Sequence, residues 1–562
     1  MIGVIASPEE EPIVREFFEL FKVPWEFYTD KRKYEVVLCG DCPNPDGLNA
    51  KLVVLYSGHE TASDVKPKGP VQTQGRETTL TLAGKRLPIY GDFVTFPESF
   101  TFLRESTSDK PVAWIRQTND RVLVRVGYDL FREIRFLITN GQPQKNAAIP
   151  TLDRHIQLLR ELITSSGIPL LEIPPVPAGY PFIVCLTHDL DHARLSRHKL
   201  DPPMFGFLFR ATLGSVSRAA RGRLSLKGLV SNWVAAAKLP FIYLGLADDI
   251  WYSFDRYVDL EKGKPSTFFV VPFEKRPGHP SKRAAPRSRA TRYDVSHVAE
   301  KLPRLRAAGC EIGLHGIDAW FQASLGRAEA ARISEFSKTT TSGVRMHWLF
   351  NNEKSPGIIE EAGFSYDSTV GYNETVGYHA GTSQVFKQLS ARNLLELPMH
   401  VMDTALFYPA HLDLSEKDAF SEILPFLDNA TYDGGVVTIN WHDRSIAPER
   451  QWGNFYVRVL QELDTRAAWF CTASNAVSWF RMRRSISFDR PTCKDNELRV
   501  TLAAPGDASI PGFRLRRHQP AMLSDLFQPA GFARRRYDET FFTGSLDVPL
   551  PDSLTSQNET RN

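Results

Sequence analysis

The sequence predicts an α/β protein whose largest part is a distorted parallel β/α barrel, and two observations carry that prediction. Between residues 182 and 484, short apolar runs repeatedly end in polar or ionisable residues and are followed by helical stretches. That order is typical of a parallel β/α barrel, in which functional residues lie at the carboxyl ends of the strands. Residues 1–172 alternate short apolar runs with helical patterns, which predicts a separate N-terminal α/β domain of unknown role.

Seven apolar runs are the expected strands of the barrel: Phe182–Leu186, Ser266–Val271, Glu311–Leu314, Gly343–Trp348, Leu394–Pro398, Gly434–Asn440 and Ala468–Thr472. A proline-rich linker over residues 173–181 precedes the first strand. A mostly helical insertion over residues 194–253 follows the first strand, and a basic loop over residues 274–293 follows the second. Residues 485–562 carry short alternating runs and turn residues, which predicts a small β-rich C-terminal extension packed on the barrel.

Composition excludes several classes of protein. Lys and Arg number 68 against 65 Asp and Glu, a net charge of +3, so a nucleic-acid-binding protein is not expected. Six cysteines in 562 residues are too few for a secreted disulfide scaffold. The chain has no apolar stretch of about 18 residues that would span a membrane, and its start lacks the basic segment of a signal peptide. We therefore expect a cytoplasmic protein.

Ionisable residues gather where the predicted strands end. The segment Cys185-Leu-Thr-His-Asp-Leu-Asp-His192 places Asp189 and Asp191 on one face of a strand, because side chains two residues apart point the same way. Two carboxylates so close need a cation or an arginine beside them. Further strand ends contribute His315, Asp318, Arg345, His347 and His442. Each alone also fits a polar turn or a buried hydrogen-bonded histidine, but together they predict one site at the mouth of the barrel.

These segments resemble the polysaccharide deacetylase (NodB-homology) family, metal-dependent hydrolases that remove acetyl groups from N-acetylated sugars. The resemblance extends over about residues 180–480 and implies a NodB-like barrel. Thr187-His-Asp-Leu-Asp191 resembles the first motif, which implies that Asp189 is the general base and Asp191 a metal ligand. Glu311-Ile-Gly-Leu-His315 resembles the second motif, whose histidine binds the metal.

The later motifs imply the remaining roles. Arg345 lies where the family has an arginine that orients the catalytic base, and Trp441-His442 resembles the motif whose histidine is the general acid. Asp367, within Gly363–Thr369, is a candidate to orient His442, or else part of a helix-capping turn.

One position departs from the family pattern. The second motif normally has another metal-binding histidine four residues after the first, and Ala319 occupies that position. We expect His347 to supply the third ligand, with Asp318 as the alternative; a site that has lost its metal and its activity is the third possibility. The expected cofactor is a divalent metal, with Zn²⁺ as the first choice.

The sequence therefore predicts metal-dependent hydrolysis of an N-acetyl group on a sugar of a surface or exported polysaccharide, or of its lipid-linked precursor. The alternatives are a catalytically inactive, deacetylase-like carbohydrate-binding or assembly protein, and an amidase that acts on a non-sugar amide. Trp320 and Tyr378 are the candidates for stacking on a sugar ring.

The expected partner is an N-acetylated glycan that is anionic or lipid-linked, because both interruptions of the barrel are basic and such loops surround the active site. Their basic residues are Arg194, Arg197, His198, Lys199, Arg218, Arg221, Arg223, Lys227, Lys275, Arg276, Lys282, Arg283, Arg287, Arg289 and Arg292. The helical stretch over residues 224–252 mixes apolar and basic residues, which also predicts peripheral contact with the inner face of an anionic membrane.

Overall fold

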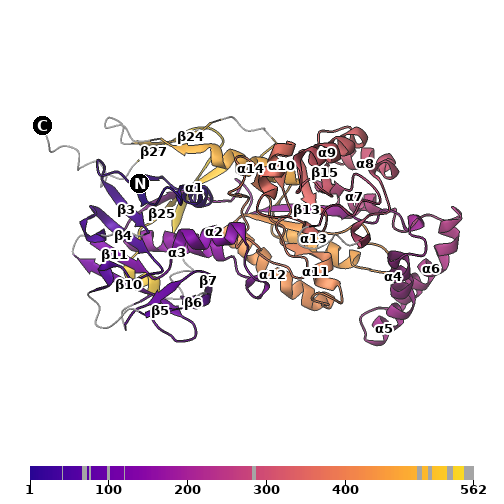
Figure 1. Cartoon of the computed structure of the whole chain (residues 1–562), viewed down its shortest axis with the longest axis horizontal. Helices are drawn as coiled ribbons and strands as arrows, with labels where there is room; N and C mark the ends of the chain where they lie inside the picture. The colour runs from indigo at the N-terminus through magenta and orange to yellow at the C-terminus, as the bar shows by residue number, and fades with distance from the viewer. Residues whose placement is uncertain are drawn as a thin grey trace. The chain divides into compact units, whose positions relative to one another are not determined.

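The computed structural model describes residues 1–40, 42, 44–65, 72–74, 77–97, 101–118, 121–280, 287–489, 497–503, 509–527 and 536–549. The chain divides into two compact units (Figure 1). The first contains Met1–Gly179, Ala380–Thr382 and Trp479–Asn562, and the second contains Tyr180–His379 and Ser383–Ser478. They are called here the N-terminal unit and the barrel unit.

The N-terminal unit is built on a six-stranded sheet with the order β10-β11-β4-β3-β1-β2. Neighbouring strands are parallel except for β10 and β11. The strands are β1 (Ile2–Ile5), β2 (Trp25–Phe27), β3 (Tyr34–Cys39), β4 (Ala50–Tyr56), β10 (Ala113–Thr118) and β11 (Arg121–Val126). The helices are α1 (Glu11–Leu20), α2 (Leu130–Thr139) and α3 (Thr151–Ser165). The predicted N-terminal α/β domain is confirmed.

Smaller antiparallel sheets complete this unit. They contain β5 (Gln72–Gln74), β6 (Thr78–Leu82), β7 (Lys85–Ile89), β8 (Phe93–Thr95), β9 (Leu103–Glu105), β12 (Leu170–Glu172), β23 (Ile486–Phe488), β24 (Glu497–Leu502), β25 (Phe513–His518), β26 (Tyr537–Phe542) and β27 (Leu546–Pro549). The C-terminal extension is β-rich, as predicted. We expected it to pack on the barrel; β25 pairs with β12, so the extension belongs to the N-terminal unit.

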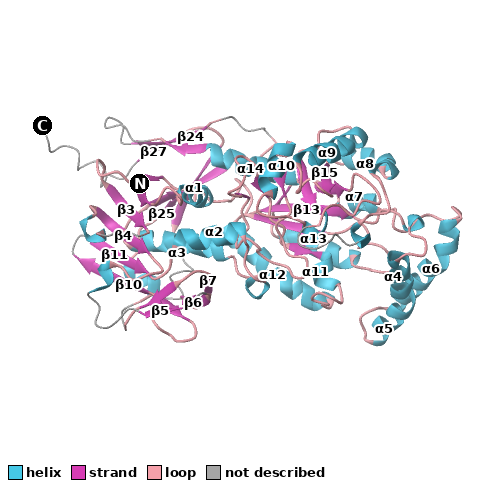
Figure 2. Cartoon of the chain, in the orientation of Figure 1, coloured by secondary structure: helices cyan, strands magenta, loops and turns pink. Residues whose placement is uncertain are grey.

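The barrel unit is built on one curled, mixed sheet with the order β18-β19-β17-β16-β15-β14-β13-β21-β20, and β22 pairs with β13. Figure 2 labels two of these strands, β13 and β15, among the helices of the unit. Neighbouring strands are parallel except for β18 and β19. The strands are β13 (Ile183–Leu190), β14 (Ser266–Val270), β15 (Glu311–Gly316), β16 (Gly343–Met346), β17 (Tyr366–Asp367), β18 (Phe386–Lys387), β19 (Leu395–Glu396), β20 (Val401–Met402), β21 (Val436–Asn440) and β22 (Trp469–Phe470). The predicted distorted parallel β/α barrel is confirmed.

Helices follow these strands. They are α7 (Tyr257–Glu261), α8 (Leu302–Ala307), α9 (Ala323–Ser337), α10 (Ser355–Ala362), α11 (Asp403–Phe407), α12 (Glu416–Asp433), α13 (Gly453–Thr465) and α14 (Ala473–Ser485). The insertion after β13 is helical and contains α4 (Pro202–Phe209), α5 (Ser215–Ala220) and α6 (Leu226–Tyr243), with a π-helical turn at Arg210–Gly214.

The parallel sheet explains why its strand ends carry the site. Every residue of β13 is buried, as expected for a parallel strand that is covered on both faces. The sheet is tight at Gly343, where a Cβ atom would lie 1.9 Å from the ring of Tyr366, so only glycine fits. Because neighbouring strands are packed this closely, the polar side chains at their carboxyl ends have fixed positions relative to one another.

Candidate metal centre and active site

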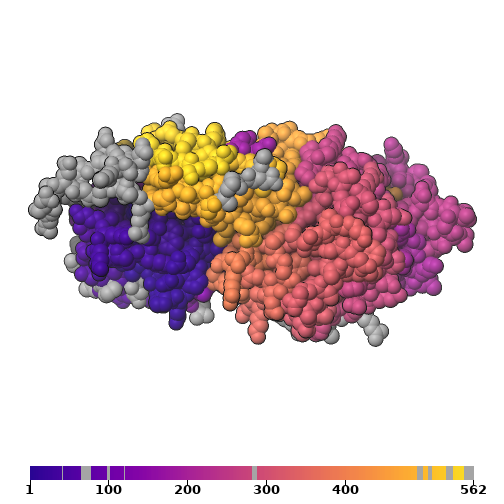
Figure 3. All heavy atoms as spheres, turned by 90° about the horizontal axis from the view of Figure 1, so that it is seen from above, coloured from indigo at the N-terminus to yellow at the C-terminus, as the bar shows by residue number. Residues whose placement is uncertain are grey.

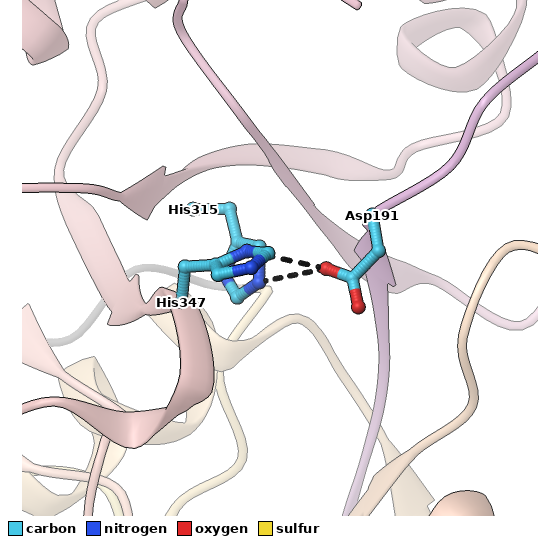
Figure 4. Close-up of side chains that lie close together, drawn as sticks. All are labelled: Asp191, His315 and His347. Atoms are coloured by element: carbon cyan, nitrogen blue, oxygen red, sulfur yellow. Dashed lines mark ion pairs between the residues drawn. The ribbon is translucent and has the colours of Figure 1, made fainter. Parts of the chain in front are cut away.

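Three side chains from neighbouring strand ends converge to form what is called here the metal cluster. Asp191 follows β13, His315 lies in β15 and His347 follows β16, and one ligand atom from each lies within 4.8 Å of the others. Asp191 Oδ1 is 3.2 Å from His315 Nε2 and 3.4 Å from His347 Nδ1 (Figure 4). The parallel register places His315 opposite Arg345, two residues before His347, which brings the two imidazoles together.

Main-chain contacts fix both histidines. His315 Nδ1 lies 3.0 Å from the carbonyl oxygen of Arg345, which favours the hydrogen on Nδ1 and leaves the lone pair of Nε2 facing Asp191. The carbonyl oxygen of His347 accepts a hydrogen bond from Arg289 Nη2 at 2.9 Å. Arg289, one of the basic residues expected around the active site, is 2% exposed and positions the main chain beside the cluster.

The chemistry of the cluster fits a divalent metal. Asp191 Oδ1 and His347 Nδ1 are buried and have no hydrogen-bond partner among the described residues. Burial lowers the pKa of His347 to about 3, which keeps the imidazole neutral, as a metal ligand must be. One carboxylate and two imidazoles are donors that zinc accepts.

Asp189 lies beside the cluster and is paired with Arg345. Arg345 Nη1 donates to Asp189 Oδ1 at 3.0 Å, and Asn440 Nδ2 donates to Asp189 Oδ2 at 2.8 Å. Arg345 is anchored in turn by the carbonyl oxygen of Ser368, 3.0 Å from its Nε. Burial raises the pKa of Asp189, but Arg345 and the nearby histidines outweigh it, so the pKa lies below its ordinary value. Asp189 is therefore an ionised carboxylate, 4.0 Å from His315 Nε2.

His442 reaches the cluster from the end of β21, and its Nε2 lies 3.7 Å from Asp191 Oδ2. Its Nδ1 lies 2.6 Å from Asp403 Oδ1, and its main-chain N–H donates to Asp403 Oδ2 at 2.7 Å. The hydroxyl of Ser445 also donates to Asp403. Burial lowers the pKa of His442, but Asp403 and the other carboxylates raise it to about 10. The side chain is therefore an imidazolium that is able to donate a proton.

Asp318, the alternative to His347 as third metal ligand, does not belong to the metal cluster. Its Oδ1 accepts the main-chain N–H of His279 at 2.7 Å and lies 3.2 Å from His279 Nδ1. Its own main-chain N–H donates to Glu329 at 2.8 Å. Asp318 therefore closes a loop, and His347 is the third member of the cluster.

The structure also corrects the role of Asp367, because Asp403 holds His442 instead. Asp367 accepts a hydrogen bond from the hydroxyl of Thr369. Burial raises its pKa to about 7, and the buried carboxyl of Glu396 lies beside it. The sequence analysis missed Asp403 because it follows β20, which has only two residues; the available signal was a carboxylate directly after the apolar pair Val401–Met402.

A basic pocket of about 630 Å³ lies beside the metal cluster and is lined by His192, which follows Asp191. The start of the helical insertion, from His198 to Arg210, forms another part of its wall. Its cationic lining residues are Arg210, Lys275, Arg292 and Arg444. His192 and His198 also line it, and burial lowers the pKa of both imidazoles. Asp201, another lining residue, lies 3.4 Å from Arg292 Nε. Arg210 Nε and Nη2 are buried without a hydrogen-bond partner in the described part of the chain. The neighbouring Arg450 lowers the pKa of Tyr408, which also lines this pocket, to about 7 against the effect of burial. The predicted basic residues Lys282 and Arg283 lie outside the described residues.

The aromatic prediction is wrong in detail. Trp320 and Tyr378 are 1% and 2% exposed and belong to the barrel core, so neither is available to a sugar ring. Trp348 is 41% exposed, and its ring centroid lies 6.0 Å from that of His347. Trp348 also has a φ of 62°, a left-handed conformation that bulky residues rarely adopt and that is found at functional sites.

No family model and no curated protein matches the chain. Among solved structures, Agd3, described as a novel carbohydrate deacetylase, matches over 98% of this chain and 99% of its own, with 9% identity and a TM-score of 0.35. The peptidoglycan deacetylase PdaC from Bacillus subtilis matches over 54% and 93%, with 12% identity and a TM-score of 0.23. PuuE allantoinase matches over 54% and 92%, with 15% identity and a TM-score of 0.33. The solved structures that match this chain thus include deacetylases of carbohydrate and peptidoglycan.

Proposed function

We propose that this chain hydrolyses the N-acetyl group of a sugar with the help of a divalent metal. One observation carries the proposal: the metal cluster is in contact with an ionised carboxylate and with an imidazolium. Asp189 lies 4.0 Å from His315 Nε2, and His442 Nε2 lies 3.7 Å from Asp191 Oδ2. Amide hydrolysis needs this combination, because water must lose a proton and the leaving nitrogen must gain one.

The metal cluster would hold the ion, for which we propose Zn²⁺. When bound, such an ion supplies Lewis-acid chemistry, since it polarises a carbonyl group and makes water more acidic. Asp191 Oδ1, His315 Nε2 and His347 Nδ1 would be its ligands, and the ion would bond to the two of these atoms, Asp191 Oδ1 and His347 Nδ1, that have no hydrogen-bond partner among the described residues.

Two residues of the chain move protons. Asp189 takes the proton of the attacking water, and Arg345 and Asn440 hold its two oxygens so that it stays ionised and correctly oriented. His442 donates a proton to the sugar nitrogen as the C–N bond breaks, and Asp403 keeps it protonated beforehand. Each such group contributes about 10²–10⁴-fold to the rate.

The basic pocket supports an anionic substrate. Arg210 has two buried nitrogens without a partner among the residues described, and Arg444 lies near enough to Asp191 for their charges to interact. A phosphate or carboxylate group on the substrate would satisfy these cations. We therefore propose an acidic glycan or a sugar carried on a lipid phosphate, with Trp348 as the surface for a sugar ring.

Acetate release from a panel of substrates, with and without chelator, tests the proposal. We expect turnover of anionic or lipid-diphosphate-linked N-acetyl sugars, less turnover of neutral chitin-type oligomers, and loss of activity with chelator. The rate on anionic substrates should fall as salt shortens the Debye length below about 10 Å. Metal binding without acetate release from any glycan would indicate an inactive binding protein, and release only from non-sugar amides would indicate an amidase.

A further inference from the structure

The exposed apolar surface of the chain is concentrated in one segment. Seventeen large apolar side chains are exposed among the described residues, and twelve of them lie between Leu200 and Leu246. They are Leu200, Phe205, Phe209, Leu213, Val216, Leu226, Val230, Trp233, Val234, Phe241, Leu244 and Leu246. The segment comprises α4, α5 and α6 at the outer edge of the barrel unit (Figure 1 and Figure 3). Such a concentration marks an interaction surface.

Helix α6 is apolar on two opposite sides. Its buried residues are Gly228, Asn232, Ala235, Leu239 and Ile242. Its large exposed apolar residues are Leu226, Val230, Trp233, Val234 and Phe241. With 3.6 residues in each turn, the two sets fall on opposite faces of the helix. The buried face packs against α4 and the barrel, whereas no described residue covers the other face. A helix that is apolar all round is normally covered all round.

The other limb of the insertion repeats this pattern. Its buried residues include Met204, Phe207 and Ala211, which pack in the same cluster as the buried face of α6. Its exposed apolar residues are Phe205, Phe209, Leu213 and Val216, at intervals of four, four and three residues. That spacing makes a second exposed apolar stripe.

The charge of the segment has one sign. Between Pro202 and Ala247 the basic residues are Arg210, Arg218, Arg221, Arg223, Lys227 and Lys238, and the sequence has no acidic residue there. Lys227 and Lys238 lie along one edge of the exposed stripe of α6, and neither forms an ion pair with a residue that the structure describes. Apolar stripes with basic residues beside them are typical of helices that lie in the interface of an anionic membrane.

We propose that the helical insertion docks on an anionic bilayer, with its exposed apolar stripes among the upper acyl chains and its basic side chains at the level of the phosphates. None of the helices that the structure describes is long and apolar enough to cross a membrane. An interfacial helix buries one apolar face in the membrane and keeps its other side on the protein, as the two faces of α6 require. A second copy of this chain would bring two surfaces of like charge together, which opposes such a contact.

The same insertion reaches the proposed active site. His198, Asp201 and Arg210, at its base, line the basic pocket. A sugar carried on a lipid phosphate has its anionic group at the membrane surface, so docking of the insertion would present this pocket to it. This second step rests on the proposed function, whereas the docking itself does not.

Flotation of the purified full-length chain with vesicles tests the docking. We expect binding to phosphatidylcholine vesicles that contain phosphatidylglycerol and much weaker binding to pure phosphatidylcholine. The variant V230E/W233E/F241E should reduce binding at least about tenfold, because the three side chains lose their burial. The variant K227E/K238E should reduce binding to anionic vesicles about fivefold or more for each residue. Met522→Glu is the matched control, because Met522 is 71% exposed outside the insertion.

Wild-type protein that fails to bind anionic vesicles, or a triple variant that binds like wild type, would overturn the proposal. Sedimentation velocity tests whether a second copy of the chain occupies this surface instead. If the wild type is a dimer, the triple variant is a monomer and neither binds vesicles, the surface is an interface between two copies. Thermal unfolding and metal content show that each variant is folded. Acetate release from a soluble substrate should be the same in the triple variant and the wild type. If no variant and no wild type releases acetate, the proposed function fails while the flotation result still decides the docking.

Discussion

Two buried Arg–Asp pairs, one in each unit, show what separates a structural ion pair from one in a functional site. In the N-terminal unit, Arg125 Nη2 lies 3.2 Å from Asp64 Oδ2. In the barrel unit, Arg345 Nη1 lies 3.0 Å from Asp189 Oδ1. All four side chains are buried, and each arginine neutralises a carboxylate whose burial would otherwise be costly.

The difference lies in what surrounds each pair. Arg125 also donates to the carbonyl oxygens of Ser57 and His59, at 2.8 and 2.7 Å. These further hydrogen bonds of the arginine are to main-chain oxygens, which is a structural role. Asp189 instead adjoins Asp191, whose buried Oδ1 has no hydrogen-bond partner among the described residues. A buried polar atom left without a partner inside the protein needs an explanation, and a bound ion is one. We therefore infer that the same type of pair serves stability in the N-terminal unit and, in the proposed active site, chemistry.

The largest effect is expected at the barrel pair. Asp189→Asn keeps the shape of the side chain but removes the proton acceptor, so acetate release should fall about 10²–10⁴-fold while metal content is unchanged. Asp191→Asn should lose both activity and metal, because Asp191 belongs to the metal cluster. Acetate assays and elemental analysis measure the two properties. Equal metal loss in both variants would show that the two aspartates do not divide these roles.

The pair of the N-terminal unit should respond in the opposite way. Asp64→Asn leaves the buried Arg125 without a counter-ion, which should destabilise this unit by about 3–5 kcal/mol without lowering the specific activity of the folded protein. Urea denaturation measures the free energy of unfolding. Asp46→Asn is the control, because Asp46 is 55% exposed in its pair with Arg116 and should contribute about 0–1 kcal/mol. Similar effects of the two substitutions would remove the distinction between buried and exposed pairs.

His347→Ala tests which residue replaces the histidine that is absent at Ala319. We expect metal per chain to fall from about one to near zero, because the cluster retains only two ligands. Asp318→Ala should keep the metal, since Asp318 is bonded to His279 instead. Elemental analysis of both variants measures this. Metal loss only in the Asp318 variant would reverse the assignment.

The sequence predicted the barrel and most of the site because both follow from strand ends. Asp189, Asp191, His315 and Arg345 lie on strands with long apolar runs or directly after them, so the parallel pattern was sufficient to place them together. His347 was predicted by its spacing of two from Arg345 on the same strand.

The rest depended on contacts between distant segments. Asp403 follows a strand of only two residues, too short to leave an apolar pattern, so Asp367 was chosen in its place. The burial of Trp320 and Tyr378 and the pairing of β25 with β12 are tertiary contacts that local periodicity does not encode. Sequence patterns thus locate strand ends well but do not decide which of several carboxylates a given side chain meets.

Asp403→Asn separates positioning of His442 from direct catalysis. We expect acetate release to fall about 10–100-fold, with metal retained, because His442 loses the carboxylate that holds and protonates it. Loss of the Asp403 charge lowers the pKa of His442. The variant should therefore lose activity on the alkaline side at a lower pH than the wild type does. Asp367→Asn should change neither the rate nor the pH profile substantially, because Asp367 bonds to Thr369. An unchanged pH profile in the Asp403 variant would show that Asp403 acts only on structure.

The smallest effect is expected at His155, a buried histidine of the N-terminal unit whose pKa, unlike that of His442, is shifted by burial and by no carboxylate among the described residues. Its Nδ1 lies 3.1 Å from the hydroxyl of Tyr128, and burial lowers its pKa from the ordinary 6.5 to about 3. The folded form therefore keeps the imidazole neutral while the unfolded chain takes up a proton below pH 6.5. The contribution of the neutral His155 to the free energy of unfolding is fully present above pH 6.5. It is lost as the pH falls toward 3, by at most about 1.4 kcal/mol for each pH unit. His155→Gln removes this proton uptake, so urea denaturation of the variant should show a smaller loss of stability between pH 6.5 and 5 than the wild type. Parallel pH profiles of variant and wild type would mean that His155 already takes up its proton in the folded protein.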